Sequence, residues 1–259
     1  MRAGLRTTVF VIASLAVAGM LLNRVAAPAW SAAREKQPAL KLDSSMTAAG
    51  QGVTLALLGG FRALVADAAW MRMFARWEAR DLPGVETLIH VVSAIDPRPA
   101  YFWMNGARIV AYDLPVWRIE AAGGFEAVTK PVQERIRREQ AQQALRHIEA
   151  AMAFHPASAD LWIERGSIEL NKLGDLAAAA ESFRRAWEQP HAPFYAARLH
   201  GELLRRQGKK TEALAWLIQL HPLQPPDPEE PKADVVLARI RALERDLGVP
   251  PARAFQPAR

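Results

Sequence analysis

The sequence of 259 residues contains no cysteine. A disulfide framework, a thiolate-ligated metal site and a cysteine nucleophile are therefore excluded. A Gly-x-Ser-x-Gly elbow, a Gly-x-x-x-x-Gly-Lys phosphate loop and a dinucleotide-binding glycine fingerprint are also missing. No metal-ligand spacing connects the histidines, which are His90, His147, His155, His191, His200 and His221. These absences lead us to expect no cofactor, no metal and no enzymatic activity, although missing motifs alone do not exclude catalysis.

Neither sign of charge dominates, since 33 basic residues stand against 27 acidic ones. Basic residues gather at 135–139 and between Arg198 and Lys210. Nucleic-acid binding would require exposed aromatic side chains interleaved with such clusters on one surface. Their neighbours are instead Glu, Gln and apolar residues. We therefore expect solvated helix faces and no nucleic-acid partner.

One charge-free apolar run is long enough to cross a membrane. TTVFVIASLAVAGMLLN (7–23) follows Arg2 and Arg6 and reaches the lower length limit for a spanning helix. Two outcomes are open: residues 1–30 are a retained single-pass signal anchor, or a signal peptide is cleaved after Ala27, Pro28 and Ala29. Either outcome predicts an extracytoplasmic body, and the retained anchor, which we favour, predicts a single-pass inner-membrane protein.

The basic residues that follow the run, Arg24 among them, oppose this orientation and leave a cytoplasmic body as the alternative. A second apolar stretch, residues 53–75, contains Arg62, Asp67 and Arg72. These charges would be costly in hydrocarbon, so the stretch predicts a buried helix of a soluble body.

A stripe of small and apolar residues with helical spacing i, i+4, i+7 recurs four times. The four stripes are separated by 59, 35 and 34 residues, and the last two distances match a helix-turn-helix repeat of about 34 residues. The members are Val85, Ile89, Val92; Ala144, Ile148, Ala151; Ala179, Phe183, Ala186; and Ala213, Leu217, Leu220. The pattern predicts four helix pairs.

Each stripe ends near a proline, which stops the second helix of a pair and starts the next pair. Trp103 and Trp162 both follow their proline, Pro97 or Pro156, by six residues. We expect each tryptophan to pack its helix against the helix just finished. Small residues one turn later, such as Gly166, are expected to let the paired helices touch.

The segment LWIERGSIELNKLGDLAAAAESFRRAWEQP (161–190) resembles a tetratricopeptide repeat, and the match covers about 66–222 as four units. LLGGFRALVADAAWMRM, AIDPRPAYFW and PHAPFYAARLHGELLRRQGKKTEAL resemble a group of uncharacterised bacterial membrane-anchored tetratricopeptide proteins. The resemblance implies an all-α, right-handed helical solenoid that recognises proteins, and it implies no reaction.

The expected organisation contains one insertion, near 113–138, because the first stripe distance exceeds the period by 25 residues. Pro131 predicts a long helix over 131–154, preceded by a short helix around 116–127. The insertion is either a second contact site or a flap over Trp103 or Trp117. The full division is anchor 1–30, tether 31–52, solenoid 53–222, proline-rich linker 223–231, capping helix 232–248 with Val235, Val236, Ile240, Leu243 and Leu247 as its stripe, and a frayed tail 249–259.

In tetratricopeptide solenoids the first helices line the concave face where partners bind. Transferred to this sequence, the resemblance gives Tyr101, Met104, Arg108, Tyr112, Asp160, Ile163, Ser167, Asn171, Tyr195, Arg198, Glu202 and Arg205. All three tyrosines of the chain fall in this set, and Tyr101 and Tyr195 are the preferred contacts. The three arginines predict a protein partner that contributes an acidic peptide or a C-terminal carboxylate.

Three functions compete at this stage. The favoured one is a membrane-tethered scaffold or adaptor for protein–protein interaction at the bacterial cell envelope. The alternatives are an envelope-biogenesis factor that binds an anionic ligand, and an accessory subunit of an enzyme complex. In the last case the chemistry would reside between Gly59 and Arg72 or in the insertion.

Overall fold

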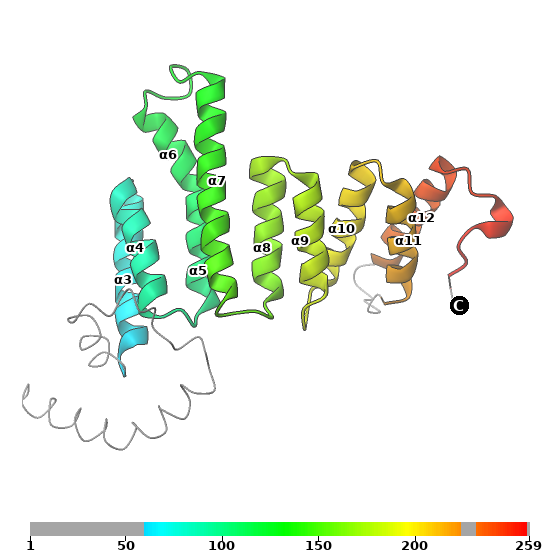
Figure 1. The fold of residues 1–259 in the computed structure, drawn as a ribbon, viewed down its shortest axis with the longest axis horizontal. Coiled ribbons are helices and arrows are strands. Elements are labelled where there is room, and N and C mark those ends of the chain that lie inside the picture. Colours follow the sequence, from blue (N-terminus) through cyan, green and yellow to red (C-terminus); the bar gives the residue numbers. More distant parts are fainter. Residues whose placement is uncertain (1–59, 224–231, 258–259) are drawn as a thin grey trace, which may run out of the picture. The chain divides into compact units, whose positions relative to one another are not determined.

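The computed structural model describes residues 60–223 and 232–257, and these residues form helices and turns with no strand. The chain divides into two units at Ala68. Helix α3 (Arg62–Glu78) crosses the division, and the later helices belong to the second unit (Figure 1). The predicted anchor, tether and most of the proline-rich linker lie outside the described residues. None of the described helices is both long and apolar enough to span a membrane.

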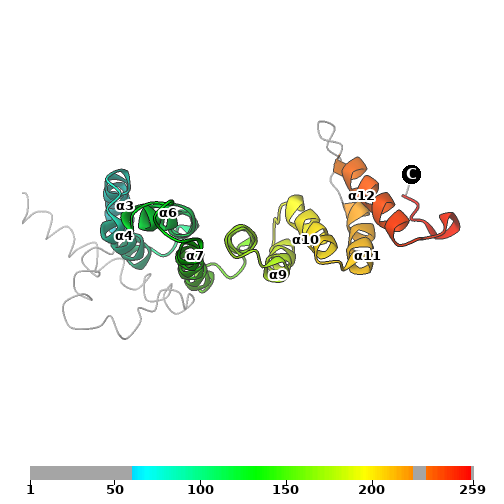
Figure 2. The same ribbon diagram turned by 90° about the horizontal axis from the view of Figure 1, so that it is seen from above.

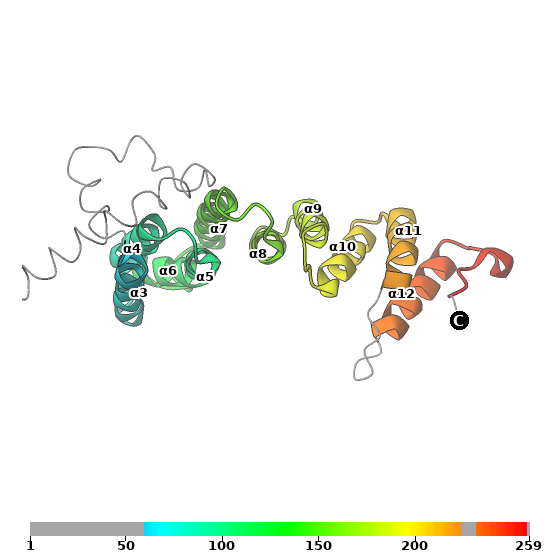
Figure 3. The ribbon, with the colours of Figure 1, turned by 90° about the horizontal axis from the view of Figure 1, so that it is seen from below.

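The described chain contains successive helix pairs. Each second helix packs against the first helix of the next pair, and end-on views show two rows, with α6, α8, α10 and α12 in one and α7, α9 and α11 in the other (Figures 2 and 3). The pairs are α3 with α4 (Leu82–Ile95); α5 (Ala100–Arg108), the π-helical turn η3 (Ile109–Asp113) and α6 (Leu114–Ala121) with α7 (Lys130–Met152); α8 (Ala159–Ile168) and the π-helical turn η4 (Glu169–Leu173) with α9 (Leu176–Trp187); and α10 (Phe194–Arg206) with α11 (Lys210–Leu220).

The predicted stripes form the centre of this stack. All twelve stripe residues are at most 3% exposed, and each triplet lies on the second helix of its pair. Burying an alanine at the first stripe position lets a neighbouring helix approach closely, while Phe183 or Leu217 fills the space one turn later. The prediction of an all-helical array of helix pairs is confirmed at this level.

Glycines set the close contacts within pairs. A Cβ atom at Gly166 would lie 3.1 Å from the Phe183 ring, and one at Gly201 would lie 3.0 Å from Leu217 Cδ2. At Gly106 the nearest atoms would be Ile89 Cγ2 at 2.8 Å and a ring nitrogen of α7 at 3.0 Å. The paired helices therefore touch through glycine, as the sequence predicts.

The two tryptophans behave differently. Trp103 Nε1 donates a hydrogen bond to the Pro97 carbonyl oxygen at 2.9 Å, and its ring stacks on Phe154, just after the end of α7, with 5.8 Å between centroids. Trp162 is half-buried under the Arg185 guanidinium of α9, and its indole makes no hydrogen bond within the described part of the chain. Both rings contact the second helix of their own pair, through His147 of α7 and Arg185 of α9. The predicted packing onto the preceding helix stays a prediction.

Replacing Trp103 with phenylalanine is expected to lower the free energy of unfolding by about 1 kcal/mol, because the ring stacking stays and the hydrogen bond to Pro97 is lost. The matched Trp162→Phe variant loses no such bond and is expected to change stability by less than about 0.5 kcal/mol. Urea denaturation of the two variants checks the difference. Equal losses would show that the bond contributes nothing to stability.

The insertion lengthens both helices of one pair. The short helix expected around 116–127 is present as α6 but begins and ends earlier, at Leu114–Ala121, and it continues α5 through η3 without a break. Because Pro115 has no N–H to donate, the wider π-helical turn precedes it, with Leu114 N–H bonding Ile109 O. The predicted long helix is confirmed within two residues as Lys130–Met152, with Pro131 in its first turn.

The lengthened pair also braces the first pair. Trp117 is buried beside Trp77 of α3 at a centroid distance of 6.0 Å, and Arg118 pairs with Glu86 of α4 at 2.6 Å. Trp103 is instead covered by α7 itself. At the tip, buried Gln133 donates to the carbonyl oxygens of Phe125 and Val128 at 2.7 and 2.8 Å and holds the loop 122–129.

Helix α12 (Lys232–Asp246) closes the stack through Val236, Ile240 and Leu243, which pack on α11. Val235 and Leu247, also predicted for the stripe, are exposed because they lie off its i, i+4, i+7 line or beyond the helix end. The described part of the tail is ordered by contacts: Phe255 lies over His221 at 5.3 Å and its N–H donates to buried Glu244. The expectation of fraying is wrong as far as residue 257.

Helix α3 is amphipathic and only partly buried. Trp70 and Met73 are buried, whereas the charged residues Asp67 and Arg72 are exposed. The predicted buried helix is therefore confirmed for one face only, and Asp67 and Arg72 lie outside that face.

Candidate partner-binding face

We call the twelve residues predicted from the first helices the partner face. An ion pair connects two successive first helices across it, since Arg108 Nη2 of α5 lies 2.6 Å from Glu164 Oε2 of α8. Arg108 Nε donates to the same oxygen at 2.7 Å. Glu164 is buried, and this hydrogen bond raises the pKa of Arg108. Arg108 is therefore neutralised within the molecule.

Tyr195 lies on α10, the first helix of the fourth pair. Burial and the negative charge of Asp160 raise the pKa of Tyr195, and Arg108 opposes them. The side chains of Arg108, Asp160, Glu164 and Tyr195 therefore lie close enough to interact electrostatically. The structure brings together residues that are up to 87 positions apart in the sequence.

Two predicted residues lie in the π-helical turns. Tyr112 is in η3 and Asn171 is in η4, and a hydrogen bond between their side chains lowers the pKa of Tyr112 against the larger effect of burial. Lys172, the next residue in η4, places its Nζ 3.7 Å from the centre of the Tyr112 ring. Burial lowers the pKa of Lys172, and nearby Arg137 adds to the effect. Equivalent turns of two successive pairs therefore meet through their side chains.

The remaining predicted residues play unequal parts. Tyr101 is half-exposed and contacts Trp70 edge-to-face at 5.8 Å. Ser167 donates to the Ile163 carbonyl oxygen within its own helix, which leaves it turned to the backbone. Met104 and Ile163 are half-buried. Of this group, only Tyr101 offers a large exposed apolar surface.

The arginines of α10 also differ from one another. Arg205 forms an ion pair with Glu202 at 2.6 Å, and Arg239 of α12 approaches the same carboxylate at 3.4 Å. Arg198 is half-buried, and its Nε has no hydrogen bond within the described part of the chain. Two of the three arginines expected to bind an acidic peptide, Arg108 and Arg205, thus already have a carboxylate.

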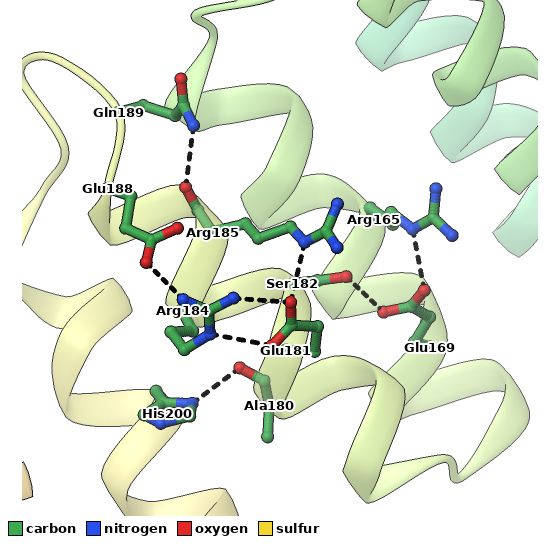
Figure 4. Close-up of polar contacts among 10 residues, drawn as sticks. All are labelled: Arg165, Glu169, Ala180, Glu181, Ser182, Arg184, Arg185, Glu188, Gln189 and His200. Atoms are coloured by element: carbon green, nitrogen blue, oxygen red, sulfur yellow. Dashed lines mark hydrogen bonds and ion pairs between the residues drawn. The ribbon is translucent and has the colours of Figure 1, made fainter.

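A polar layer beneath the face joins α8, α9 and α10 (Figure 4). Buried Glu169 accepts from Arg165 Nε at 2.9 Å and from Ser182 Oγ at 2.6 Å. His200 Nδ1 lies 2.8 Å from the Ala180 carbonyl oxygen. These bonds satisfy groups that would be costly to bury alone, so they fix the helices that carry the face.

Glu164, Lys172 and Glu169 are the residues that sequence reasoning missed. Each is adjacent in sequence to a predicted position or lies in the same turn, and its importance depends on a partner from another helix. The histidines serve as structural groups, for example His155 Nε2 at 3.0 Å from the Pro97 carbonyl oxygen. No cluster of His, Asp and Glu suited to a metal ion occurs among residues 60–223 and 232–257.

A shallow opening lies at the turn between α3 and α4. Its lining includes Arg72, Arg76, Asp81 and Thr87. Asp81 pairs with Arg76 at 3.0 Å and caps α4 by accepting from Gly84 N–H at 3.1 Å. The carboxylate in this opening is therefore engaged in holding the turn.

Comparison with known proteins does not assign this chain to a family. No protein-family model matches the sequence, and no curated protein matches it. Among solved structures, "Crystal structure of MamA protein" aligns at 14% identity over 75% of this chain and 98% of that chain, with a TM-score of 0.30. A TM-score at this level does not establish a common fold.

Proposed function

We propose that the protein is an interaction scaffold, tethered to the bacterial inner membrane, that binds a segment of another protein along the partner face. One observation carries the proposal: the Arg108–Glu164 ion pair joins two successive first helices, and Tyr101 and Tyr195 are exposed at equivalent places on the first helices α5 and α10. Arrays of helix pairs present extended surfaces of this kind. Exposed tyrosines on such a surface favour partner binding.

The proposal assigns no catalytic step to this chain. Several polar groups on the partner face are paired within the chain, as with Arg108 and Ser167. Such pairing suits rigid presentation of a surface better than proton transfer. The tether rests on the apolar run 7–23 and the arginines before it, which also favour an extracytoplasmic body.

The test is affinity capture from native membranes with the tagged full chain and a Tyr101→Ala, Tyr195→Ala double variant. We expect the variant to recover a specific partner at least about tenfold less well, because exposed aromatic anchors contribute on the order of 1–2 kcal/mol each. Mass spectrometry measures the recovery.

The control is a Val91→Ala, Phe125→Ala double variant, which removes two exposed apolar side chains outside the partner face. It should recover the partner as the parent chain does. Loss of the partner with this control and retention with the tyrosine variant would move the binding site to α4 or to the insertion.

A further inference from the structure

Three exposed residues occupy the same place in successive first helices. Tyr101, Asp160 and Tyr195 are each the second residue of their helix, in α5, α8 and α10. Their spacings of 59 and 35 residues equal the spacings of the buried stripes. The array thus repeats one surface position as tyrosine, aspartate and tyrosine, and we call this set the Tyr-Asp-Tyr row.

Asp160 is a free negative charge in this row. Within residues 60–223 and 232–257 its carboxylate forms no ion pair or hydrogen bond, and the side chain is exposed. Two of the three arginines of the partner face are already matched, because Arg108 pairs with Glu164 and Arg205 pairs with Glu202. The third, Arg198, is half-buried, whereas Asp160 is exposed, so the accessible unpaired charge of the row is negative.

The two tyrosines flank that charge with accessible rings. Tyr101 is 51% exposed and Tyr195 is 42% exposed, so each ring presents a face to a partner. Asp160 and Tyr195 hold equivalent places on successive first helices, and the negative charge of Asp160 adds to the burial that raises the pKa of Tyr195. A carboxylate beside an aromatic face binds a cationic side chain through both the ion pair and the cation–π attraction.

We infer that the segment bound by the partner face is basic, and that one of its lysine or arginine side chains lies against Tyr195 with its charge on Asp160. A second cationic or methyl-rich side chain reaches Tyr101. This inference rests on the proposed function and replaces the acidic partner expected from sequence. It does so because an acidic segment would have to compete with Glu164 and Glu202 for Arg108 and Arg205.

Arg198 is the feature that favours the opposite sign. It lies one turn beyond Tyr195 on α10, and its Nε lacks a hydrogen bond within the described residues. An acidic segment would bind Arg198, so the experiment must distinguish binding at Asp160 from binding at Arg198.

The experiment uses the full chain in a mild nonionic detergent and two short fluorescein-labelled peptides, one alternating lysine with glycine and one alternating glutamate with glycine. Fluorescence anisotropy at low ionic strength measures the dissociation constants. We expect the lysine peptide to bind about threefold to fivefold more weakly to Asp160→Asn and to Tyr195→Leu than to the parent chain. Tyr195→Phe keeps the ring and should bind like the parent.

Glu149→Gln is the matched control, since Glu149 is an exposed acid on the second helix α7. It should leave binding of the lysine peptide unchanged. Thermal unfolding by circular dichroism checks that Asp160→Asn, which removes a charge from the first turn of α8, stays folded at the assay temperature.

The outcomes separate this inference from the proposed function. Binding of the lysine peptide that Asp160→Asn leaves unchanged, or no binding of that peptide, would overturn the inference. Tighter binding of the glutamate peptide that Arg198→Gln abolishes would overturn it while supporting the partner face. Failure of the tyrosine double variant to alter affinity capture would overturn the proposed function itself.

Discussion

Phe183→Ala is expected to lower the free energy of unfolding by about 4 kcal/mol. Phe183 is 2% exposed and is among the largest fully buried side chains of the described chain. Its ring lies on Gly166 of α8, and the cluster around it also includes Ala196 and Leu203 of α10. Alanine would leave a cavity at the point where three helices meet, and glycine on one side provides no side chain to fill it.

Urea denaturation followed by circular dichroism measures this loss. Phe125→Ala is the control, because Phe125 is 44% exposed on the insertion loop and its removal should change stability by less than about 1 kcal/mol. A loss below about 1.5 kcal/mol for Phe183→Ala would mean that α8, α9 and α10 do not pack as described.

The second large effect is a loss of stability in acid that arises from His147. This side chain is buried between Trp103 and His90, and its Nε2 has no hydrogen bond within the described part of the chain. Burial lowers the pKa of His147 to about 4, and the charge of His90 adds to the effect. In the unfolded chain the pKa of a histidine returns to about 6.5.

The folded protein therefore binds fewer protons than the unfolded chain between these two pH values. The contribution to stability is complete above pH 6.5 and is lost progressively as the pH falls to about 4, by about 3 kcal/mol in total. His147→Leu should remove this part of the pH dependence. Buried His200, whose pKa burial also lowers, should keep a smaller slope in the same direction.

Urea denaturation at several pH values between 4 and 7 checks this prediction. His191→Asn is the matched control, since His191 is exposed with φ of 57°, a conformation that asparagine tolerates. It should keep the pH dependence of the parent chain. A His147→Leu chain with the parent slope would show that another group causes the acid loss.

The helix pairs could be predicted because the pattern that encodes them is local. Val85, Ile89 and Val92 share one helix face whatever surrounds them, and the same spacing recurs at fixed distances. Proline positions then divide the helices. Such signals require no knowledge of which helix lies next to which.

Contacts between helices could not be predicted in the same way. Trp103 and Trp162 follow a proline at one spacing, yet only Trp103 bonds the proline carbonyl, because its indole reaches Pro97 while the Trp162 ring lies under Arg185. Similarly, the sequence identifies no partner for Arg108, whereas the structure shows that it pairs with Glu164. Pairing of charges depends on distances between successive repeats, which the sequence alone does not provide.

The C-terminal segment also makes contacts that the sequence alone does not predict. Proline and polar residues after α12 indicate an irregular tail, and the segment is irregular. Phe255 nonetheless packs on the last cluster, because buried Glu244 offers an acceptor for its N–H. An irregular backbone can be well anchored when a single apolar side chain and one backbone bond hold it.

The contact of Gly106 with α4 and α7 lies in the half of its helix pair away from the tip at 122–129. Further along the pair, Trp117 and Arg118 contact α3 and α4. Chain length beyond these contacts can change without altering how the pairs stack. The tip is thus a permissive position, where a fluorescent domain or an epitope could be inserted between Gly123 and Gly124 while the rest of the array keeps its architecture.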